Sequence, residues 1–239
     1  MLAIYDANLE EKKNSLSRGA VLNRTKLYNE LLQRFIKREL KKGAKGKEVF
    51  FNELDTNEQI KEIESQMEKL GVVALGMFNR GKLSLKKGEL DNDLNYLQIK
   101  MPEYNEGGKK LTNAEILFGS FFFIHDSQSS GEVEDEKEEA FEFLHKTFYE
   151  FLLADLLLKY LVAVVNKLNM LRSLDDKSLY VDALKKGDFA CKYYTAMIHN
   201  CLCTEAETIK MLAEWKMYII KAYFKGTQDD FDIVMNDLF

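Results

Sequence analysis

A single proline, Pro102, stands in a chain of 239 residues, together with only 13 glycines. Because proline ends or bends a helix and glycine weakens one, so few of either leave long stretches free for helices. Hydrophobic residues make up 46% of the chain and charged residues 31%, which provides apolar surface for a core and charge for a solvated exterior. The sequence therefore predicts a globular, mainly α-helical protein.

Apolar residues recur at helical spacing in several segments. One predicted helix follows the capping segment 23–25 and ends at the glycine break 43–46. A second runs from near Thr56 to Arg80-Gly81. The same pattern predicts further helices over 87–97, 147–169, 176–186, 188–200, 204–224 and 228–237.

The middle of the chain has a different pattern. The run 116–124 is apolar without a break; a helix could begin it at Thr112, but its aromatic end favours a strand. The segment 140–144 alternates apolar and polar residues, as a half-buried strand does. Residues 127–139 between them are polar and charged, which predicts a loop. Two strands joined by a polar loop after helices indicate a winged helix with this loop as its wing.

These patterns together predict a mainly α fold. A helical domain and a winged-helix domain with a short β-hairpin are expected first, and a C-terminal helical bundle follows them. The predicted domains are 1–47 for the helical segment, 48–170 for the winged-helix-like domain and 171–239 for the C-terminal helical domain.

Charge and cysteine content argue against several classes of function. The net charge is −5, and the basic residues between 37 and 47 are interpreted as a solvated helix end, so nucleic acid is not an expected partner. The apolar stretch 152–165 is shorter than the roughly 20 residues that cross a bilayer, so no membrane span is expected. Three cysteines without a signal peptide are typical of a reducing, cytoplasmic setting.

No complete catalytic site is evident in the sequence. It contains neither a phosphate-binding glycine loop nor a nucleophile elbow, and its three histidines are His125, His145 and His199. The cysteines Cys191, Cys201 and Cys203 lie near His199, but their spacing does not suit a metal, and buried structural cysteines are the preferred interpretation. The chain is therefore not expected to be an enzyme or to hold a metal.

His145 is the candidate site residue that remains. It stands where the predicted strand ends and the next helix begins, and the free N–H groups of a helix start suit an anion. The alternative is a histidine packed at a domain junction, since histidine is commonly part-buried. Thr147 is expected to cap this helix, with Glu150 three residues on at capping-box spacing.

Residues 143–154 read Phe-Leu-His-Lys-Thr-Phe-Tyr-Glu-Phe-Leu-Leu-Ala. This segment resembles the F-x-H-x-[ST]-F-x-E-[FY]-x-A-A motif in the winged-helix domain of NACHT-type STAND NTPases, the class of NOD-like receptors and bacterial antiphage sensors. It departs from the motif at Leu153, and at Tyr149 the family often has glutamine. The segments 27–35 and 70–81 are similar to the helix after the nucleotide-binding core and to the first winged-helix-domain helix. The resemblance covers roughly residues 1–170.

The resemblance implies roles for the motif residues. His145 would contact the β-phosphate of bound ADP and hold the closed, inactive arrangement. Thr147 and Glu150 have a structural interpretation as helix-capping residues. Phe143, Phe148 and Phe151 would anchor the strand to the helix.

The nucleotide-binding motifs of that family, Walker A and Walker B, are missing from the sequence. No cofactor is therefore expected in the isolated chain, and ADP or ATP would bind only with a complete nucleotide-binding core, present in cis or in trans. The resemblance also allows a homo-oligomer in the full-length protein and implies a role in antiviral defence.

Two functions follow from these expectations. The first is a regulatory and oligomerisation module of a STAND-type signalling NTPase, not catalytic by itself. The alternative is a helical protein–protein interaction module with no nucleotide link, which has no need of a histidine at position 145. DNA binding through the winged helix is disfavoured, because such surfaces are usually basic and this wing is acidic.

Overall fold

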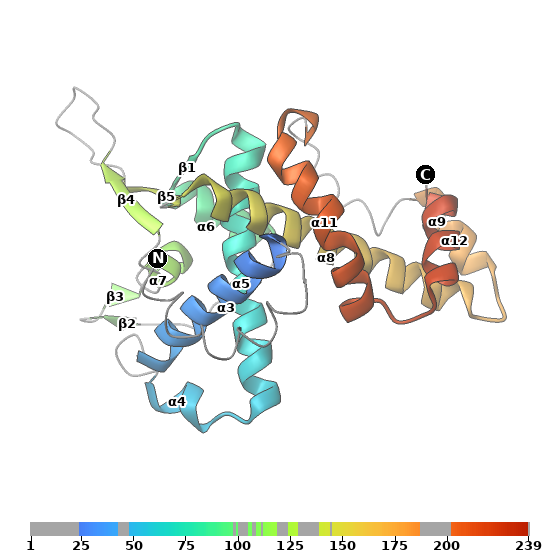
Figure 1. Ribbon diagram of the computed structural model, residues 1–239, viewed down its shortest axis with the longest axis horizontal. Helices are drawn as coiled ribbons and strands as arrows, with labels where there is room; N and C mark the ends of the chain where they lie inside the picture. Colours follow the sequence, from blue (N-terminus) through green and yellow to red (C-terminus); the bar gives the residue numbers. More distant parts are fainter. Residues whose placement is uncertain are drawn as a thin grey trace, which may run out of the picture.

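A computed structural model gives the fold, which is mainly helical with small antiparallel sheets, as predicted (Figure 1). The structure describes residues 24–42, 48–97, 99, 105–106, 109–110, 112–118, 124–128, 139–143, 145–186 and 202–238. The helices are α3 (Arg24–Lys42), α4 (Glu48–Glu53), α5 (Thr56–Arg80), α6 (Lys87–Tyr96), α7 (Asn113–Phe118), α8 (Lys146–Arg172), α9 (Ser178–Lys186), α11 (Ala206–Tyr223) and α12 (Gln228–Leu238), with a 3-10 turn η1 (Leu202–Thr204). The strands are β1 (Ser84–Lys86), β2 (Asn105–Glu106), β3 (Lys109–Lys110), β4 (Ile124–Gln128) and β5 (Glu139–Phe143).

The sheet and the helices around it have the order of a winged helix. Strands β1, β5 and β4 form one antiparallel sheet with β5 in the centre, in a register that pairs Leu85 and Asp126 with Phe141. Along the chain the elements follow as α5, β1, α6, α7, β4 and β5, with the small β2–β3 hairpin between α6 and α7. Three helices and three strands in this order agree with the predicted mainly α fold with a short β-hairpin, and the assignment of residues 48–170 to a winged-helix domain stays a prediction.

The predicted strand over 116–124 is wrong in its first part. Residues Asn113–Phe118 form helix α7, residues 119–123 lie outside the described residues, and β4 spans Ile124–Gln128. A reciprocal cap explains the helix: the Thr112 backbone N–H donates to the Glu115 carboxylate at 2.6 Å, and the Glu115 N–H donates to the Thr112 hydroxyl at 3.3 Å. These bonds satisfy backbone donors that only a helix start leaves free, so they outweigh the strand preference of the apolar run. The predicted wing begins later than expected, since Ser127 is still in β4, and its segment 129–138 lies outside the described residues.

Local capping also fixes the helix α5. The Asp55 carboxylate accepts from the Glu58 backbone N–H at 2.9 Å, and the Glu58 carboxylate accepts from the Asp55 N–H at 3.1 Å. At the other end Gly81 takes the left-handed conformation with φ 61°, which glycine adopts at little cost. The predicted limits of this helix are confirmed, and so are the predicted helices that correspond to α3 and α6.

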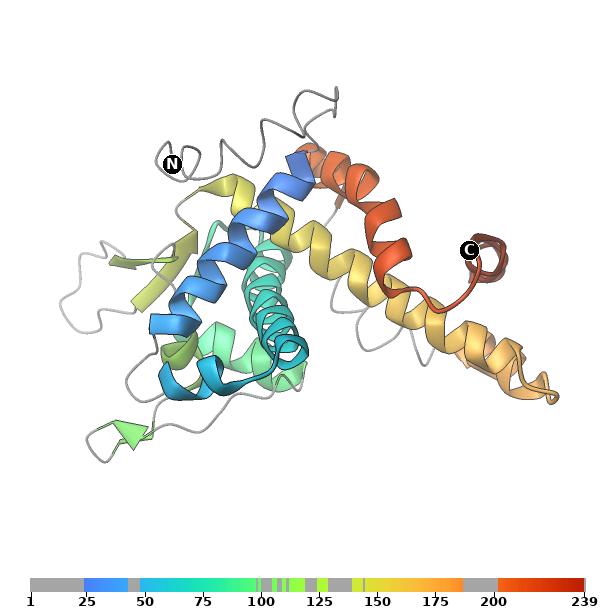
Figure 2. The same ribbon diagram turned by 60° about the horizontal axis from the view of Figure 1, so that its bottom comes forward.

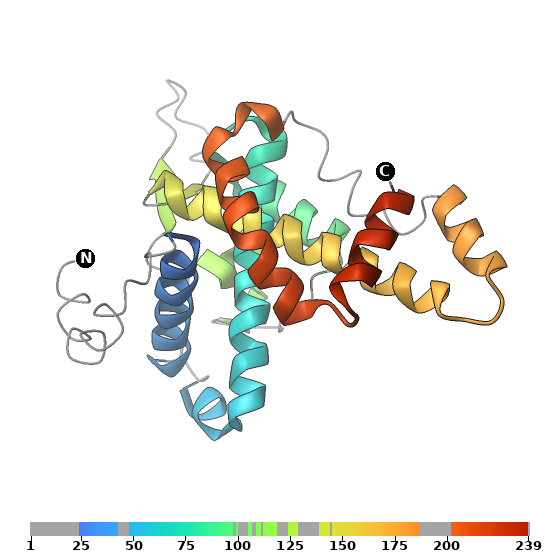
Figure 3. The same cartoon turned by 45° about the vertical axis from the view of Figure 1, so that its right-hand side comes forward.

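Helix α8 runs through the centre of the molecule. It packs against α5 near its beginning and along α11 further on, while α9 and α12 lie near its far end (Figures 2 and 3). At the crossing with α5, a Cβ on Gly71 would stand only 3.0 Å from the Cβ of Leu156, so glycine allows the two helices to approach closely. The buried apolar side chains of these helices and of the winged helix form one continuous core. The predicted domain boundaries stay a prediction.

The predicted C-terminal helices over 176–186, 204–224 and 228–237 are confirmed as α9, α11 and α12. The predicted helix over 188–200 lies outside the described residues, as do Cys191, His199 and Cys201. Cys203 lies in η1, and its side chain is not described. The expectation of buried structural cysteines therefore stays a prediction.

Candidate functional site

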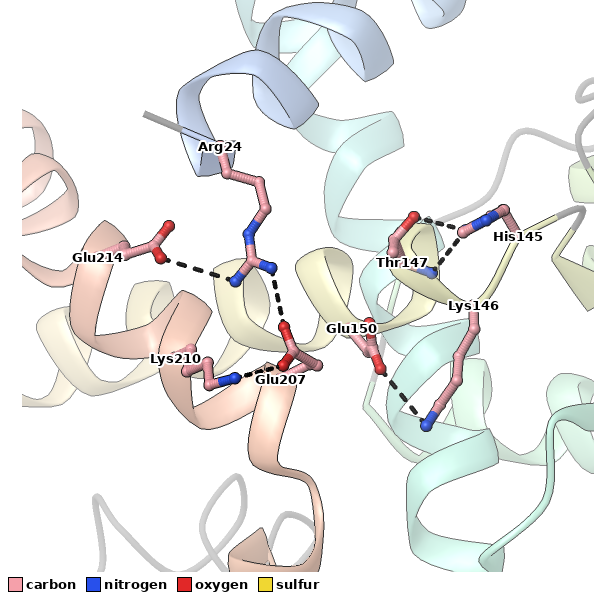
Figure 4. Close-up of polar contacts among 8 residues, drawn as sticks. All are labelled: Arg24, His145, Lys146, Thr147, Glu150, Glu207, Lys210 and Glu214. Atoms are coloured by element: carbon pink, nitrogen blue, oxygen red, sulfur yellow. Dashed lines mark hydrogen bonds and ion pairs between the residues drawn. The ribbon is translucent and has the colours of Figure 1, made fainter. Parts of the chain in front are cut away.

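The junction between β5 and α8 carries the candidate residue His145. The backbone at His145 is extended, with φ −147° and ψ 133°, as is usual for the residue just before a helix, and the helix begins at Lys146. The His145 Nδ1 accepts a hydrogen bond from the Thr147 backbone N–H at 3.2 Å, and the Thr147 hydroxyl lies 2.7 Å from the same nitrogen (Figure 4). His145 is thus the N-cap of α8.

The prediction that Thr147 caps this helix is wrong. Thr147 stands inside the first turn and donates its backbone N–H to His145, so it has no N-cap role. Glu150 cannot complete a capping box, since it lies a full turn beyond the helix start. Its side chain is buried, with only 5% exposed, and its carboxylate lies 3.4 Å from the Lys146 ammonium group. Thr147 instead donates a hydrogen bond to His145, and Glu150 forms an ion pair with Lys146.

The hydrogen bonds of His145 determine which ring nitrogen carries the proton. A backbone N–H can only donate, so Nδ1 is an acceptor in this arrangement and the proton of the neutral ring is on Nε2. The side chain is exposed, and Nε2 has no protein partner within the described part of the chain. An outward N–H donor at the positive end of a long helix is suited to bind an anion.

The two charged side chains at the start of α8, Lys146 and Glu150, differ in their exposure to solvent. Lys146 is half exposed, whereas the carboxylate of Glu150 faces the interior. Tyr149 is buried beside it, and burial, with the charges of Glu205 and Glu150, raises the pKa of its hydroxyl above the ordinary value. The Tyr149 hydroxyl therefore stays protonated at neutral pH. The solvent side of this turn therefore carries the Lys146 ammonium group beside the exposed imidazole of His145.

The three phenylalanines of the motif are all buried in the core. Phe148 and Phe151 also contact Tyr28 of α3, with ring centroids 6.2 Å apart in each pair. Phe151 further packs edge-on against Trp215 of α11 at 5.7 Å. Phe143 on β5 and the two helical phenylalanines thus share one cluster with α3 and α11. The sequence did not predict the contacts with Tyr28 and Trp215.

A charged cluster near this site was missed at the sequence level. The Arg24 guanidinium donates to the Glu207 carboxylate at 2.8 Å and lies 3.6 Å from the Glu214 carboxylate, both on α11 (Figure 4). Lys210 donates to the other oxygen of Glu207 at 2.6 Å. One signal was present: an arginine in the first turn of a helix opposes the helix dipole, which suggests a partner elsewhere.

The other candidate residues give no second site. His125 lies in β4, and its side chain is not described. Among the described residues there is no group of three His, Cys, Asp or Glu side chains that could hold a metal ion. No described helix is both long enough and apolar enough to cross a membrane.

No protein-family model, curated protein or solved structure matches this chain. The functional argument therefore depends on the motif residues and their geometry.

Proposed function

We propose that the chain is the helical and winged-helix portion of a NACHT-type STAND signalling NTPase, where it acts as a regulatory and oligomerisation module and not as an enzyme. His145 is its nucleotide sensor and donates an Nε2–H hydrogen bond to the β-phosphate of ADP. The observation that supports this proposal is the cap geometry, in which Nδ1 is occupied and Nε2 faces outward at the start of α8. The motif around His145 supplies the resemblance.

Nucleotide binding needs a second half of the site. The sequence has no Walker A or Walker B motif, so a nucleotide-binding core in cis or in trans supplies the phosphate cradle and the metal. The contact from His145 exists only while the winged helix is closed on that core. Losing the contact then shifts the population toward the open, signalling state. A cytoplasmic setting and a role in antiviral defence belong to the same proposal.

The first test is ADP and ATP binding by calorimetry. The isolated 239-residue chain is expected to bind neither, and micromolar affinity would contradict the proposal. The coding region upstream of Met1 is then read for an in-frame Walker A motif, and the protein that contains it is used for the second measurement. There, His145→Asn is expected to lower ADP affinity by about 10- to 100-fold, the range for a hydrogen bond to a charged group.

The two variants His145→Asn and His145→Ala separate the cap from the phosphate contact. Asparagine is a strong N-cap residue but does not reach as far as the imidazole Nε2. Alanine loses both functions and is expected to cost about 1 kcal/mol of stability as well. Unchanged ADP affinity in His145→Asn would show that His145 only caps α8.

A protein–protein interaction module is the alternative, and one observation favours it. Large apolar side chains are exposed near the far end of α8 and on α9 and α12, namely Met170, Leu174, Leu179, Val181 and Ile233. Exposed apolar groups of this size often mark a binding surface. If this is the function, Leu179→Asp abolishes partner binding while His145→Asn leaves every activity unchanged.

A further inference from the structure

The start of α3 lies against α11 through groups that are polar, in contrast to the apolar core below. Thr25 on α3 and Thr208 on α11 are fully buried, and the ion pair between Arg24 and Glu207 lies beside them. The Thr208 hydroxyl has no hydrogen-bond partner in the part of the chain that the structure describes. A buried hydroxyl without a partner weakens an interface, and the ion pair beside it is a stabilising contact between α3 and α11.

The favourable charge contacts of Arg24 are with α11 and not with its own helix α3. A cation in the first turn of α3 faces the positive end of the helix dipole, which is unfavourable locally. Its compensation comes from Glu207 and Glu214, which stand two turns apart on the same side of α11. The hydrogen bond to Glu207 raises the pKa of Arg24 above its ordinary value. The pair joins residues that are 183 positions apart in the sequence.

The same end of α3 touches the turn that presents His145. Tyr28, one helical turn after Arg24, packs edge-on against Phe148 and at a tilt against Phe151. Phe148 is in the first turn of α8, three residues after His145, and its backbone N–H bonds to the His145 carbonyl at 3.0 Å. A shift of α3 away from α11 would therefore withdraw Tyr28 from the turn that carries the cap.

We propose that Arg24 is a positioning residue: its ion pair with Glu207 fastens the amino-terminal end of α3 to α11 and thereby fixes the first turn of α8. This fastening sets the direction in which His145 points. The consequence for nucleotide binding rests on the function proposed above, whereas the fastening itself does not. The pair is partly exposed, so rising ionic strength weakens it.

The test is hydrogen exchange of the full 239-residue chain without nucleotide. In Arg24→Met, the amides at the start of α3 and in the first turn of α8, including Thr147, are expected to exchange about two- to fivefold faster, as for a part-exposed ion pair. Amides in α6 and α12 are expected to be unchanged. The fluorescence of Trp215, the single tryptophan, should shift as the neighbouring contact loosens.

Arg172→Met is the matched control. It breaks a similarly exposed ion pair with Asp230, 3.5 Å long, that joins α8 to α12 away from His145. This variant is expected to leave the first turn of α8 unchanged. Glu207→Gln removes the same hydrogen-bonded ion pair but leaves Arg24 beside Glu214, so it should loosen the same amides to a smaller extent, and the double variant should be less than additive.

Two outcomes would overturn the positioning role. One is an unchanged first turn in Arg24→Met, and the other is an equal rise at all amides, which indicates only global destabilisation. If the first turn loosens but ADP affinity in the complete protein does not respond to His145→Asn, the fastening stands and the nucleotide-sensing proposal is wrong.

Discussion

Lys69 is a cation held inside the molecule, on the helix α5. It is only 4% exposed, and within the described residues its ammonium group has no hydrogen bond or ion pair. Burial lowers its pKa below the ordinary 10.5, although the charges of Glu62 and Glu68 act in the opposite direction. Folding therefore favours the neutral amine, so the charged form of Lys69 at neutral pH destabilises the folded state.

Replacing Lys69 with methionine is expected to stabilise the protein. At pH 7 the free energy of unfolding in Lys69→Met should rise by about 1 kcal/mol, because methionine removes the cost of partly desolvating a charged ammonium group. Because the pKa is lowered in the folded state, this cost is fully present at neutral pH and disappears as pH rises from the folded pKa to about 10.5, so the gain in Lys69→Met should shrink over that range. Urea unfolding at several pH values measures it. Lys61→Met, at an exposed position on the same helix, is the control. A loss of stability in Lys69→Met at pH 7 would show an undetected ionic role.

At the residue scale, the sequence identified His145 as the candidate but misassigned the cap beside it. The capping rules name serine, threonine and aspartate, so Thr147 was preferred over a histidine that stood two residues earlier. The bond from the Thr147 N–H to the His145 Nδ1 goes with the extended backbone of His145, which is the usual conformation of an N-cap residue. Arg24 and Glu207 could not be paired from sequence, because 183 residues separate them.

At the element scale, the helices α5 and α6 depend on a close approach at Gly76. A Cβ there would stand 2.5 Å from the Asp93 carboxylate and 3.0 Å from Leu85. Asp93 cannot retreat freely, since Arg80 holds both of its oxygens at 2.7 and 2.9 Å. The Arg80 guanidinium also donates to the Gly76 carbonyl at 3.0 Å, which ties the same turn together.

Gly76→Ala is therefore expected to destabilise the protein by about 1–3 kcal/mol, as overpacking does, even though alanine favours a helix by about 1 kcal/mol. Gly88→Ala is the matched control, because a Cβ on Gly88 meets nothing within 4 Å, and it should be neutral or slightly stabilising. Thermal unfolding of both variants measures the difference. Equal stability of the two would mean that Asp93 and Arg80 can rearrange without cost.

The elements that the sequence predicted are those with repeated local signals. α5 has a capping box, a long apolar face and a glycine end, and each signal lies within its own segment. β1 has three residues and β2 and β3 have two each, which is too few to show an alternation of apolar and polar residues. Whether these residues form strands therefore depends on the strands with which they pair. The short helix α4 was missed for the same reason. The end of α7, residues 116–118, was assigned to a strand because a short apolar run fits either structure.

At the scale of the whole molecule, buried polar bonds join the helices around α8. The Asp155 carboxylate accepts from the Trp215 indole at 2.8 Å and from Lys159 at 2.6 Å. Tyr223 on α11 donates to Glu64 on α5 at 2.8 Å. The Lys159 bond lies within α8 at i,i+4 spacing, whereas the bonds from Trp215 and Tyr223 link different helices, and no local sequence pattern predicts them. Such bonds specify which helices pack together, which the periodicity of each helix cannot do.

Three tyrosines, of which Tyr149 and Tyr180 are buried and Tyr223 is partly buried, predict how the protein responds to alkali. Burial raises the pKa of Tyr149 and Tyr223 above the ordinary value of 10, and burial with the Asp237 contact raises the pKa of Tyr180 to about 12. A tyrosine whose pKa is higher in the folded than in the unfolded state stabilises the fold at any pH below its unfolded-state pKa. This stabilisation is lost as the pH rises through the folded-state pKa. Stability is therefore expected to fall from about pH 10 upward, and it should be mostly lost near pH 12.

Tyrosinate absorbance during a pH titration measures this, with at least these three of the eleven tyrosines ionising only as the protein unfolds. Tyr180→Phe should flatten the decline, and smooth ionisation of all tyrosines near pH 10 without unfolding would show that the three hydroxyls are open to water.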